Sequence, residues 1–188
     1  MSTAPSGAAK KSSATRSRIL AAARQAFARG GFEQSPMSLI ARRAGIDKSS
    51  LYYFFRNKED LFAAVTLDTW QKLSASVAKN LGARAGGARI LSKACRDFIA
   101  ISLAAGMAST RMELPPQSHP GHRQTLDFIR KTRKLALEFL ARHRVPQPTV
   151  AHSIISNAIH AYVIHTCTGK PQPSAKRYCD YLAALFIK

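Results

Sequence analysis

The stretch that most constrains the fold runs from residue 35 to residue 58 and reads SPMSLIARRAGIDKSSLYYFFRNK. Apolar residues recur in its first half at the spacing of one helical face: Met37, Ile40, Ala41 and Ala44. Gly45 follows directly, where a left-handed backbone ends a helix without strain. Ser35 is a candidate N-cap of this helix with Pro36 at its first position, and Asp47 is a candidate N-cap of a second helix. A helix, a glycine turn and a helix predict a helix-turn-helix motif.

The second helix of this motif has two contrasting faces. Leu51 and Phe55, four residues apart, are expected to face the core together with Phe54. The opposite face carries Lys48, Ser49, Tyr52 and Tyr53. A recognition helix places its N-terminal residues against base edges in the major groove, where hydroxyls approach closely and lysine reaches guanine or phosphate. Taken singly, Tyr52 and Tyr53 could equally be core aromatics and Lys48 a solvated charge. Their joint placement after a glycine turn favours contact with DNA.

Residues 15–62 resemble the DNA-binding domain of the TetR family of bacterial transcriptional regulators. The resemblance rests on TRSRILAAARQAFARGGF and on IARRAGIDKSSLYYFFRNKEDL, which is similar to the family pattern I-A-x-x-A-G-V-s-x-g-t-L-Y-x-y-F-x-x-K-e-x-L. It implies an all-helical homodimer, a palindromic operator in double-stranded DNA and a C-terminal domain that responds to a small-molecule inducer. By this resemblance the residues that usually meet DNA are Ser38, Lys48, Ser49, Ser50, Tyr52, Tyr53 and Lys58.

The chain departs from the family pattern at three positions. Pro36 stands where threonine is common, so the phosphate contact of that threonine must come from Ser35 or be absent. Ser38 replaces a frequently longer base-reading side chain, and Phe54 replaces a frequent histidine. Because of these departures, the resemblance does not predict the operator sequence, but it still predicts the fold.

The charge balance points to a polyanionic partner. The 29 lysines and arginines against 10 acidic residues give a net charge of +19, with an isoelectric point near 10.7, and nucleic acid is the first candidate. A membrane is the rival partner, but no apolar run approaches the roughly 18 residues of a spanning helix. The three cysteines, at irregular spacings, fit buried thiols in a reducing cytoplasm better than a disulfide framework. We therefore expect a cytoplasmic protein that does not enter the membrane.

The periodicity predicts an all-α chain of about nine helices in three segments. Residues 1–14 are expected to be a disordered basic arm, which either follows DNA phosphates or serves only as a solubilising tail. Residues 15–60 form the predicted helix-turn-helix domain. Residues 61–188 form a helical domain for ligand binding and dimerisation, which the resemblance implies.

One helix of the C-terminal domain, expected from residue 149 to residue 166, is apolar on nearly all sides. Such a helix must be covered on both sides, which predicts that one side meets a second subunit. The resemblance agrees, because the last two helices of TetR-like proteins usually form a four-helix dimer interface. The predicted interface residues are Ile155, Ile159, Val163, Tyr178, Leu182 and Leu185.

The resemblance also implies a ligand cavity in this domain. Candidate lining residues come from the helices that usually surround it: Trp70, Phe98, Met107, Met112, Phe128 and Tyr162. For each of them an ordinary core position is the alternative. We expect the ligand to favour a form whose two reading helices are misplaced, so that DNA affinity falls by the same coupling factor.

Other functional classes lack their residues. The sequence has no glycine-rich phosphate loop, no H-E-x-x-H and no G-x-S-x-G, so we expect neither an enzyme nor a bound cofactor. The spacing of His152, His160, His165 and Cys167 does not support a metal site, and nothing near the cysteines clearly lowers a thiol pKa. The main interpretation is a ligand-responsive repressor. A nonspecific architectural DNA-binding protein and a thiol- or metal-responsive regulator remain the alternatives.

Overall fold

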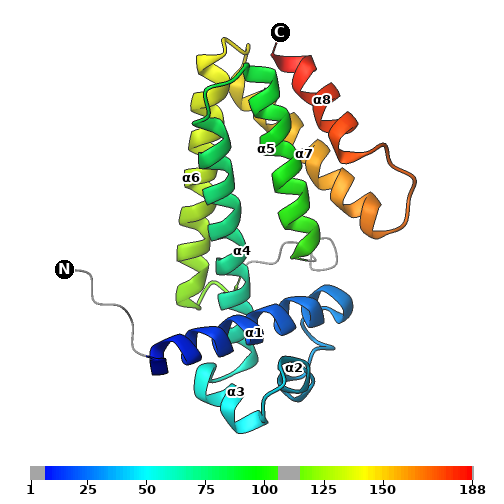
Figure 1. Ribbon diagram of the computed structural model, residues 1–188. Coiled ribbons are helices and arrows are strands. Elements are labelled where there is room, and N and C mark those ends of the chain that lie inside the picture. The colour runs from blue at the N-terminus through cyan, green and yellow to red at the C-terminus, as the bar shows by residue number, and fades with distance from the viewer. Residues whose placement is uncertain (1–6, 106–114, 188) are drawn as a thin grey trace, which may run out of the picture.

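The computed structural model describes residues 7–105 and 115–187. This part of the chain forms eight helices: α1 (Gly7–Gly30), α2 (Met37–Ala44), α3 (Lys48–Phe54), α4 (Lys58–Leu81), α5 (Gly87–Ala104), α6 (Pro120–Arg142), α7 (Pro148–Cys167) and α8 (Ala175–Phe186). Figure 1 shows α1, α2 and α3 at one end of the molecule and a helical bundle around the rest of α4. The all-α prediction is confirmed, and the helix count lies close to the expected nine.

The N-terminal helices and the first turns of α4 share one hydrophobic core. Its fully buried side chains come from all four helices and include Ile19, Phe27, Ile40, Leu51 and Leu61. The rings of Phe27, Phe32 and Phe62 pack in pairs with centroids 5.2 to 5.9 Å apart. Burying a large apolar side chain contributes about 1.5–3 kcal/mol, so this small core holds α2 and α3 at a fixed angle.

α1 begins at Gly7, earlier than the periodicity predicted. The expectation of a disordered arm over residues 1–14 is therefore wrong for residues 7–14, while residues 1–6 lie outside the described residues. The sequence from residue 8 to residue 11 is Ala-Ala-Lys-Lys, all good helix formers, and lengthening an existing helix needs no new nucleus. Residues 7–14 carry no large apolar side chain, so apolar periodicity misses this end of the helix.

The two caps predicted inside the helix-turn-helix are confirmed. Gly45 adopts the left-handed conformation, with φ of 65°, and ends α2. The Asp47 carboxylate accepts a hydrogen bond of 2.7 Å from the backbone amide of Ser50 and so caps the start of α3. Both residues therefore define the turn through local backbone chemistry.

The predicted cap at Ser35 is wrong. The N-cap of α2 is Pro36, which makes no side-chain cap hydrogen bond. Ser35 is 1% exposed, and its hydroxyl donates a hydrogen bond of 2.7 Å to the carbonyl of Gly31. That carbonyl lies at the end of α1, where helical carbonyls lack a partner within the helix, and this need turns the serine inward.

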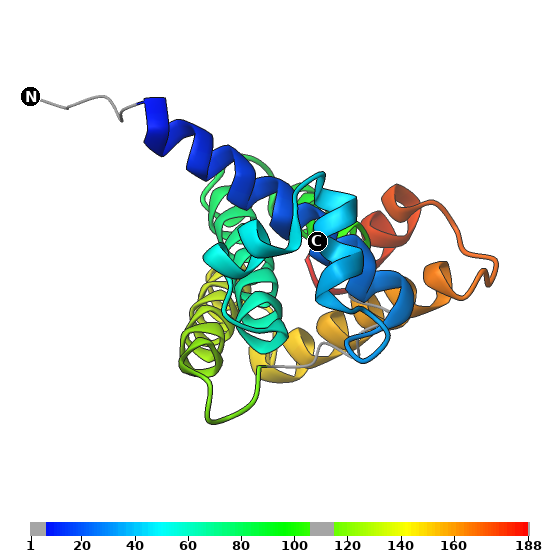
Figure 2. The ribbon, with the colours of Figure 1, turned by 90° about the horizontal axis from the view of Figure 1, so that it is seen from below.

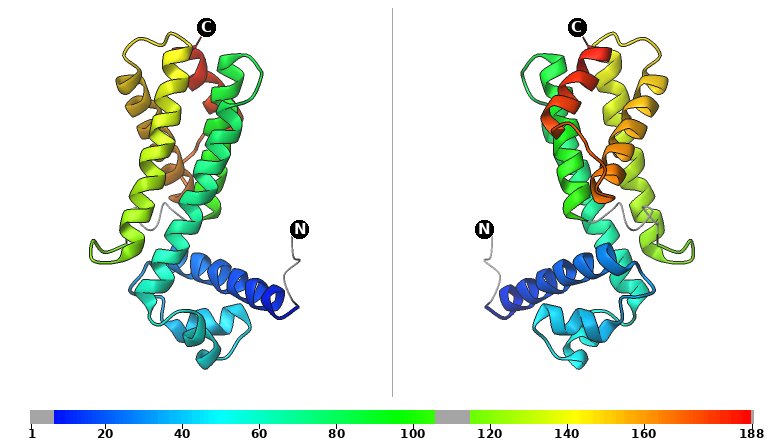
Figure 3. Two further views of the ribbon diagram at one scale, coloured as in Figure 1. Left: turned by 90° about the vertical axis from the view of Figure 1, so that its left-hand side faces the viewer. Right: turned by 90° about the vertical axis from the view of Figure 1, so that its right-hand side faces the viewer.

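α4 connects the two parts of the molecule. Its 24 residues span about 36 Å, and Figure 3 shows it running from the three N-terminal helices into the bundle. Two polar contacts join its first half to its neighbours. Arg24 of α1 forms an ion pair with Asp68, and the Nε2 of His119, at the start of α6, lies 3.0 Å from Asp60 Oδ1. The second contact links the start of α6 to the first turn of α4, whose Leu61 and Phe62 belong to the N-terminal core.

α5, α6, α7 and α8 bury a second core together with the end of α4. Four of the predicted dimer residues belong to this core, and they are Ile155, Ile159, Val163 and Leu182, between 3% and 7% exposed. The prediction is corrected for these four, because side chains already buried within the chain offer no surface to a partner. Tyr178 is half-buried, and its hydroxyl donates to the Ala158 carbonyl at 2.9 Å.

The large apolar side chains that α7 and α8 leave in solvent are Val150, Ile154, Tyr181 and Leu185, between 47% and 69% exposed. Only Leu185 was among the predicted interface residues. α7 is apolar on nearly all sides, so its periodicity could not distinguish the face that packs inside the chain from the face exposed to solvent. Although α7 is strongly apolar, no helix within the described residues combines the length and hydropathy needed to cross a membrane.

Candidate nucleic-acid interface and ligand cavity

α3 presents one face to solvent at the end of the molecule opposite the C-terminus (Figure 1). Seen from that end, α2 and α3 lie in front of the bundle (Figure 2). Leu51 and Phe55 are 0% and 5% exposed, whereas Tyr52 and Tyr53 are 43% and 85% exposed. The predicted division of α3 into a core face and an outer face is confirmed. A tyrosine this exposed leaves a large amphipathic ring available to a partner.

The Asp47 carboxylate organises the first turn of α3. It accepts hydrogen bonds from the hydroxyls of Ser49 (2.5 Å) and Ser50 (2.6 Å) and from the Ser50 amide. These bonds, that from Ser49 foremost, hold the pKa of Asp47 well below its usual range, so the group stays ionised. Because both hydroxyls donate their protons to Asp47, the serine oxygens keep lone pairs that can accept hydrogen bonds, which suits the amino groups of cytosine or adenine.

Of the remaining predicted DNA residues, Ser38 lies at the surface, whereas Lys58 bonds within the protein. Ser38 is exposed on α2. Lys58 is only 20% exposed at its side chain, and its Nζ donates a hydrogen bond of 3.0 Å to the Phe32 carbonyl. The same ammonium lies 4.1 Å from the centroid of the Phe32 ring. Lys58 thus links the start of α4 to the turn that follows α1. Ser35, which precedes α2, donates to a carbonyl of the same turn.

Basic residues around the motif add to its positive charge. Arg42 and Arg43 are exposed in the last turn of α2, and Arg56 is exposed just after α3. Arg16 of α1 stacks its guanidinium 5.3 Å from the centroid of the Phe55 ring. The sequence analysis assigned none of the first three a role, although their charge and position next to the motif were visible.

A cavity of about 260 Å³ lies between α4, α5, α6 and α7. Trp70 and Phe98 line it as predicted, with ring centroids 6.5 Å apart. Phe128 packs beside Trp70 but is not part of the lining. Tyr162 is also absent from the lining, because it turns toward the chain after α7 and donates a hydrogen bond of 2.8 Å to the Pro173 carbonyl. Met107 and Met112 lie outside the described residues.

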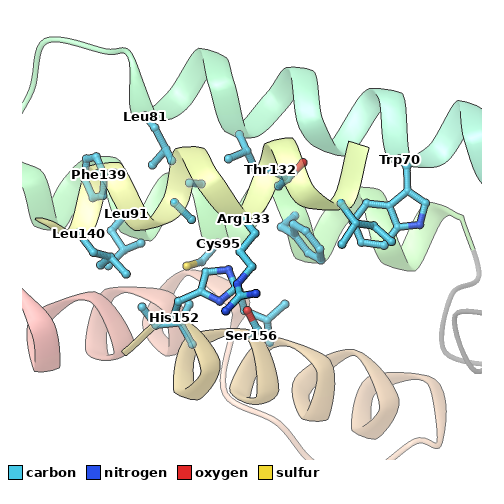
Figure 4. A pocket seen from close by; sticks show the side chains of 17 residues that line it. Trp70, Leu81, Leu91, Cys95, Thr132, Arg133, Phe139, Leu140, His152 and Ser156 are labelled. Atoms are coloured by element: carbon cyan, nitrogen blue, oxygen red, sulfur yellow. The ribbon is translucent and has the colours of Figure 1, made fainter. Parts of the chain in front are cut away.

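The polar groups of the cavity were not predicted. They are Thr132 and Arg133 from α6 and His152 and Ser156 from α7. Figure 4 shows Arg133, His152 and Ser156 close together, with Thr132 apart from them on α6. Burial, and then the nearby charge of Arg133, lower the pKa of His152 below its usual value, which favours the neutral ring. In the sequence, Arg133 stands among several basic residues of one helix and reads as part of a solvated face.

Two of the three cysteines, Cys95 and Cys179, are buried. Burial raises the pKa of Cys95 to about 12 and that of Cys179 to about 11, so both remain protonated. Cys167 is exposed at the end of α7. Among residues 7–105 and 115–187, no three histidine, cysteine or acidic side chains are placed to hold a metal ion.

Residues 19–65 match the family model of bacterial regulatory proteins of the tetR family. The match covers α2, α3 and the turn between them, together with the second half of α1 and the start of α4. The DNA-binding domain of the chain is therefore of the TetR type. α2 and α3 are the helix-turn-helix of this domain.

Among curated relatives, the chain is 38% identical over 58 residues to the HTH-type transcriptional regulator UidR of Escherichia coli K12, covering 31% of the chain and 30% of UidR. The matched stretches span only 23% to 30% of the length of the curated relatives.

Solved structures extend the likeness over the whole fold. PfmR of Thermus thermophilus, a TetR family transcriptional regulator, superposes with a TM-score of 0.76 at 18% identity, covering 89% of this chain and 97% of PfmR. The regulator FadR of Bacillus subtilis, solved in complex with stearoyl-CoA, gives a TM-score of 0.73 at 16% identity, covering 92% of this chain and 97% of FadR. At these identities the likeness shows the fold alone.

Proposed function

We propose that this TetR-family protein represses transcription as a homodimer that binds a palindromic operator and releases it when a small molecule enters the cavity. The observation that carries the proposal is the outer face of α3, where Tyr53 is 85% exposed and the ammonium of the exposed Lys48 lies 5.8 Å from the centroid of the Tyr52 ring. The core behind α3 is complete without these side chains, so packing does not account for them. The net charge of +19 supports an anionic partner.

In this proposal the residues that face DNA are Ser38, Lys48, Ser49, Ser50, Tyr52 and Tyr53. Lys48 reaches guanine or phosphate from the first turn of α3, and the two tyrosines contact phosphate or a thymine methyl group. Ser35 and Lys58 serve instead as supports, because their polar atoms already bond to carbonyls between α1 and α2.

The exposed apolar side chains of α7 and α8 support a symmetric dimer. Val150, Ile154, Tyr181 and Leu185 expose a large share of their surface on the last two helices. Contiguous apolar surface on a monomer marks an interaction site, and a two-fold axis pairs the same patch on both copies. Such a dimer presents two copies of α3 to successive turns of one face of DNA.

In this proposal, α4 carries the coupling between the ligand cavity in residues 61–188 and the DNA-binding domain. The cavity touches α4 and α6. The His119–Asp60 contact joins the start of α6 to the first turn of α4, next to the DNA-binding core. A ligand that separates α6 from α4 would therefore tilt the DNA-binding parts, and DNA affinity would fall by the coupling factor that the ligand imposes. The complex of FadR with stearoyl-CoA supports a small-molecule ligand in this fold.

Selection of bound duplexes from a random pool tests the proposal. The wild-type chain should enrich an inverted repeat, and Tyr53→Ala, which leaves the core intact, should weaken or shift the enrichment. Recovery of duplexes with no common motif would instead support the architectural alternative.

A further inference from the structure

The cavity between α4, α5, α6 and α7 sets the size of what it can hold. Its volume is about 260 Å³. An engineered apolar cavity of roughly 150 Å³ holds benzene, with six carbon atoms, so this cavity accommodates about ten in the same proportion. Most of its lining offers no hydrogen-bonding side chain: Val77, Leu81, Leu91, Ile129, Phe139, Leu140 and Ile155.

Polar side chains gather where α6 faces α7. Arg133 extends from α6 toward His152 and Ser156 of α7 (Figure 4). None of these three side chains has a hydrogen bond or ion pair to another residue in the described part of the chain. Thr132 differs, because its hydroxyl donates to the Phe128 carbonyl at 2.8 Å. Three polar groups without protein partners thus meet at one edge of an apolar space.

Within the described residues, Arg133 forms no ion pair with an acidic side chain. The lining contains no aspartate or glutamate, and α7 carries none in its sequence. The two acidic residues of α6 pair with other cations, Asp127 with Arg130 at 3.1 Å and Glu138 with Lys134 at 3.8 Å. Arg133 and Ser156 are exposed at the rim of the cavity, so their polar groups can reach the charged end of a ligand whose apolar part lies inside.

We infer that the cavity binds an anionic amphiphile, an apolar body of about ten carbon atoms whose anionic group pairs with Arg133 and accepts hydrogen bonds from Ser156 and His152. The carboxylate of a free acid and the phosphate-bearing head of an acyl thioester share this chemistry. The inference rests on the proposed ligand cavity and not on the proposed contact with DNA.

Titration of the full chain with matched amphiphiles tests the inference, read by tryptophan fluorescence. Trp70 is the one tryptophan in the sequence and lines the cavity. Decanoate should bind at least about tenfold more tightly than 1-decanol, which has the same carbon chain without the charge. Arg133→Gln should abolish the difference and leave the affinity for 1-decanol unchanged. Decanoyl-CoA in a parallel titration identifies the larger head group if its affinity exceeds that of decanoate and also depends on Arg133.

Two further variants control the test. Arg130→Gln removes the same charge one turn away from Arg133, outside the lining, and should leave both affinities unchanged. Ala136→Leu places three more carbon atoms in the lining and should weaken decanoate and 1-decanol together.

Several results would overturn the inference: no binding of any probe, equal affinity for decanoate and 1-decanol, a preference that survives Arg133→Gln, or indifference to Ala136→Leu. Loss of the proposed function is a separate outcome. A chain that binds the amphiphiles but selects no operator would refute the repressor and leave the cavity chemistry standing.

Discussion

Two neighbouring isoleucines on α7 allow the proposed dimerisation to be tested separately from the stability of the fold. Ile154 is 47% exposed, whereas Ile155 is 7% exposed and lies in the core. Substituting alanine for Ile154 removes apolar surface that only a partner can cover. The same substitution at Ile155 removes a side chain that the chain itself covers. The pair therefore gives opposite predictions for one chemical change at adjacent positions.

The size of the dimer effect follows from the exposure of Ile154. Complete burial of an isoleucine side chain is worth about 1.5–3 kcal/mol. Covering the 47% that stays exposed is then worth about 1 kcal/mol in each subunit. A two-fold interface contains the residue twice, so Ile154→Ala should cost about 2 kcal/mol and raise the dissociation constant about thirtyfold. Ile155→Ala should lower the free energy of unfolding by about 2–5 kcal/mol.

Sedimentation velocity over a dilution series measures the first effect, and urea unfolding measures the second. Ile154→Ala should shift the monomer–dimer midpoint to a higher protein concentration. At a concentration where the variant and the wild type are both monomeric, the free energy of unfolding of the variant should stay close to that of the wild type. The reasoning fails if Ile154→Ala dissociates at the wild-type concentration, or if the wild-type chain is monomeric throughout the series.

Three other perturbations test separate parts of the structure. Lys48→Gln should weaken DNA binding and reduce the slope of log K against log salt by about 1, measured by fluorescence anisotropy, and an unchanged slope would exclude a phosphate contact. A thiol reagent at mild alkaline pH should react quickly with Cys167 alone, because burial raises the pKa of Cys95 and Cys179 to about 12 and about 11, and a second fast thiol would contradict this. The hydrogen bonds of Arg56, foremost, and of His119 hold the pKa of Asp60 below its usual value of 3.8. Its contribution is thus present above that value and lost as pH falls through the lowered pKa, so Asp60→Asn should melt at a lower temperature than wild type at neutral pH and converge with it in acid.

Local backbone signals made the helix-turn-helix predictable. Gly45 and Asp47 act through the backbone of their immediate neighbours, and the structure gives both the conformation that these residue types favour. The exposed and buried sides of α3 followed from spacing alone, because a seven-residue helix against one core has only one inner face.

Features that depend on the tertiary environment were not predictable in the same way. The Ser35 hydroxyl donates to the Gly31 carbonyl instead of capping α2. This partner depends on how the chain turns after α1. On α7, the inner stripe with Ile155 and the outer stripe with Ile154 are equally apolar, so only packing against α5 and α6 distinguishes them. Arg133 reads as a surface charge until α7 is placed opposite it.

The most direct measurement of the central claim compares two affinities of the same protein at one salt concentration. The first is for the duplex enriched by selection, and the second is for a duplex of the same length and composition with scrambled order. A dimer that reads bases through α3 should prefer the selected duplex by about 1,000-fold or more. Equal affinities would contradict the account, because they would mean that the charge of the chain, and not the outer face of α3, holds the DNA.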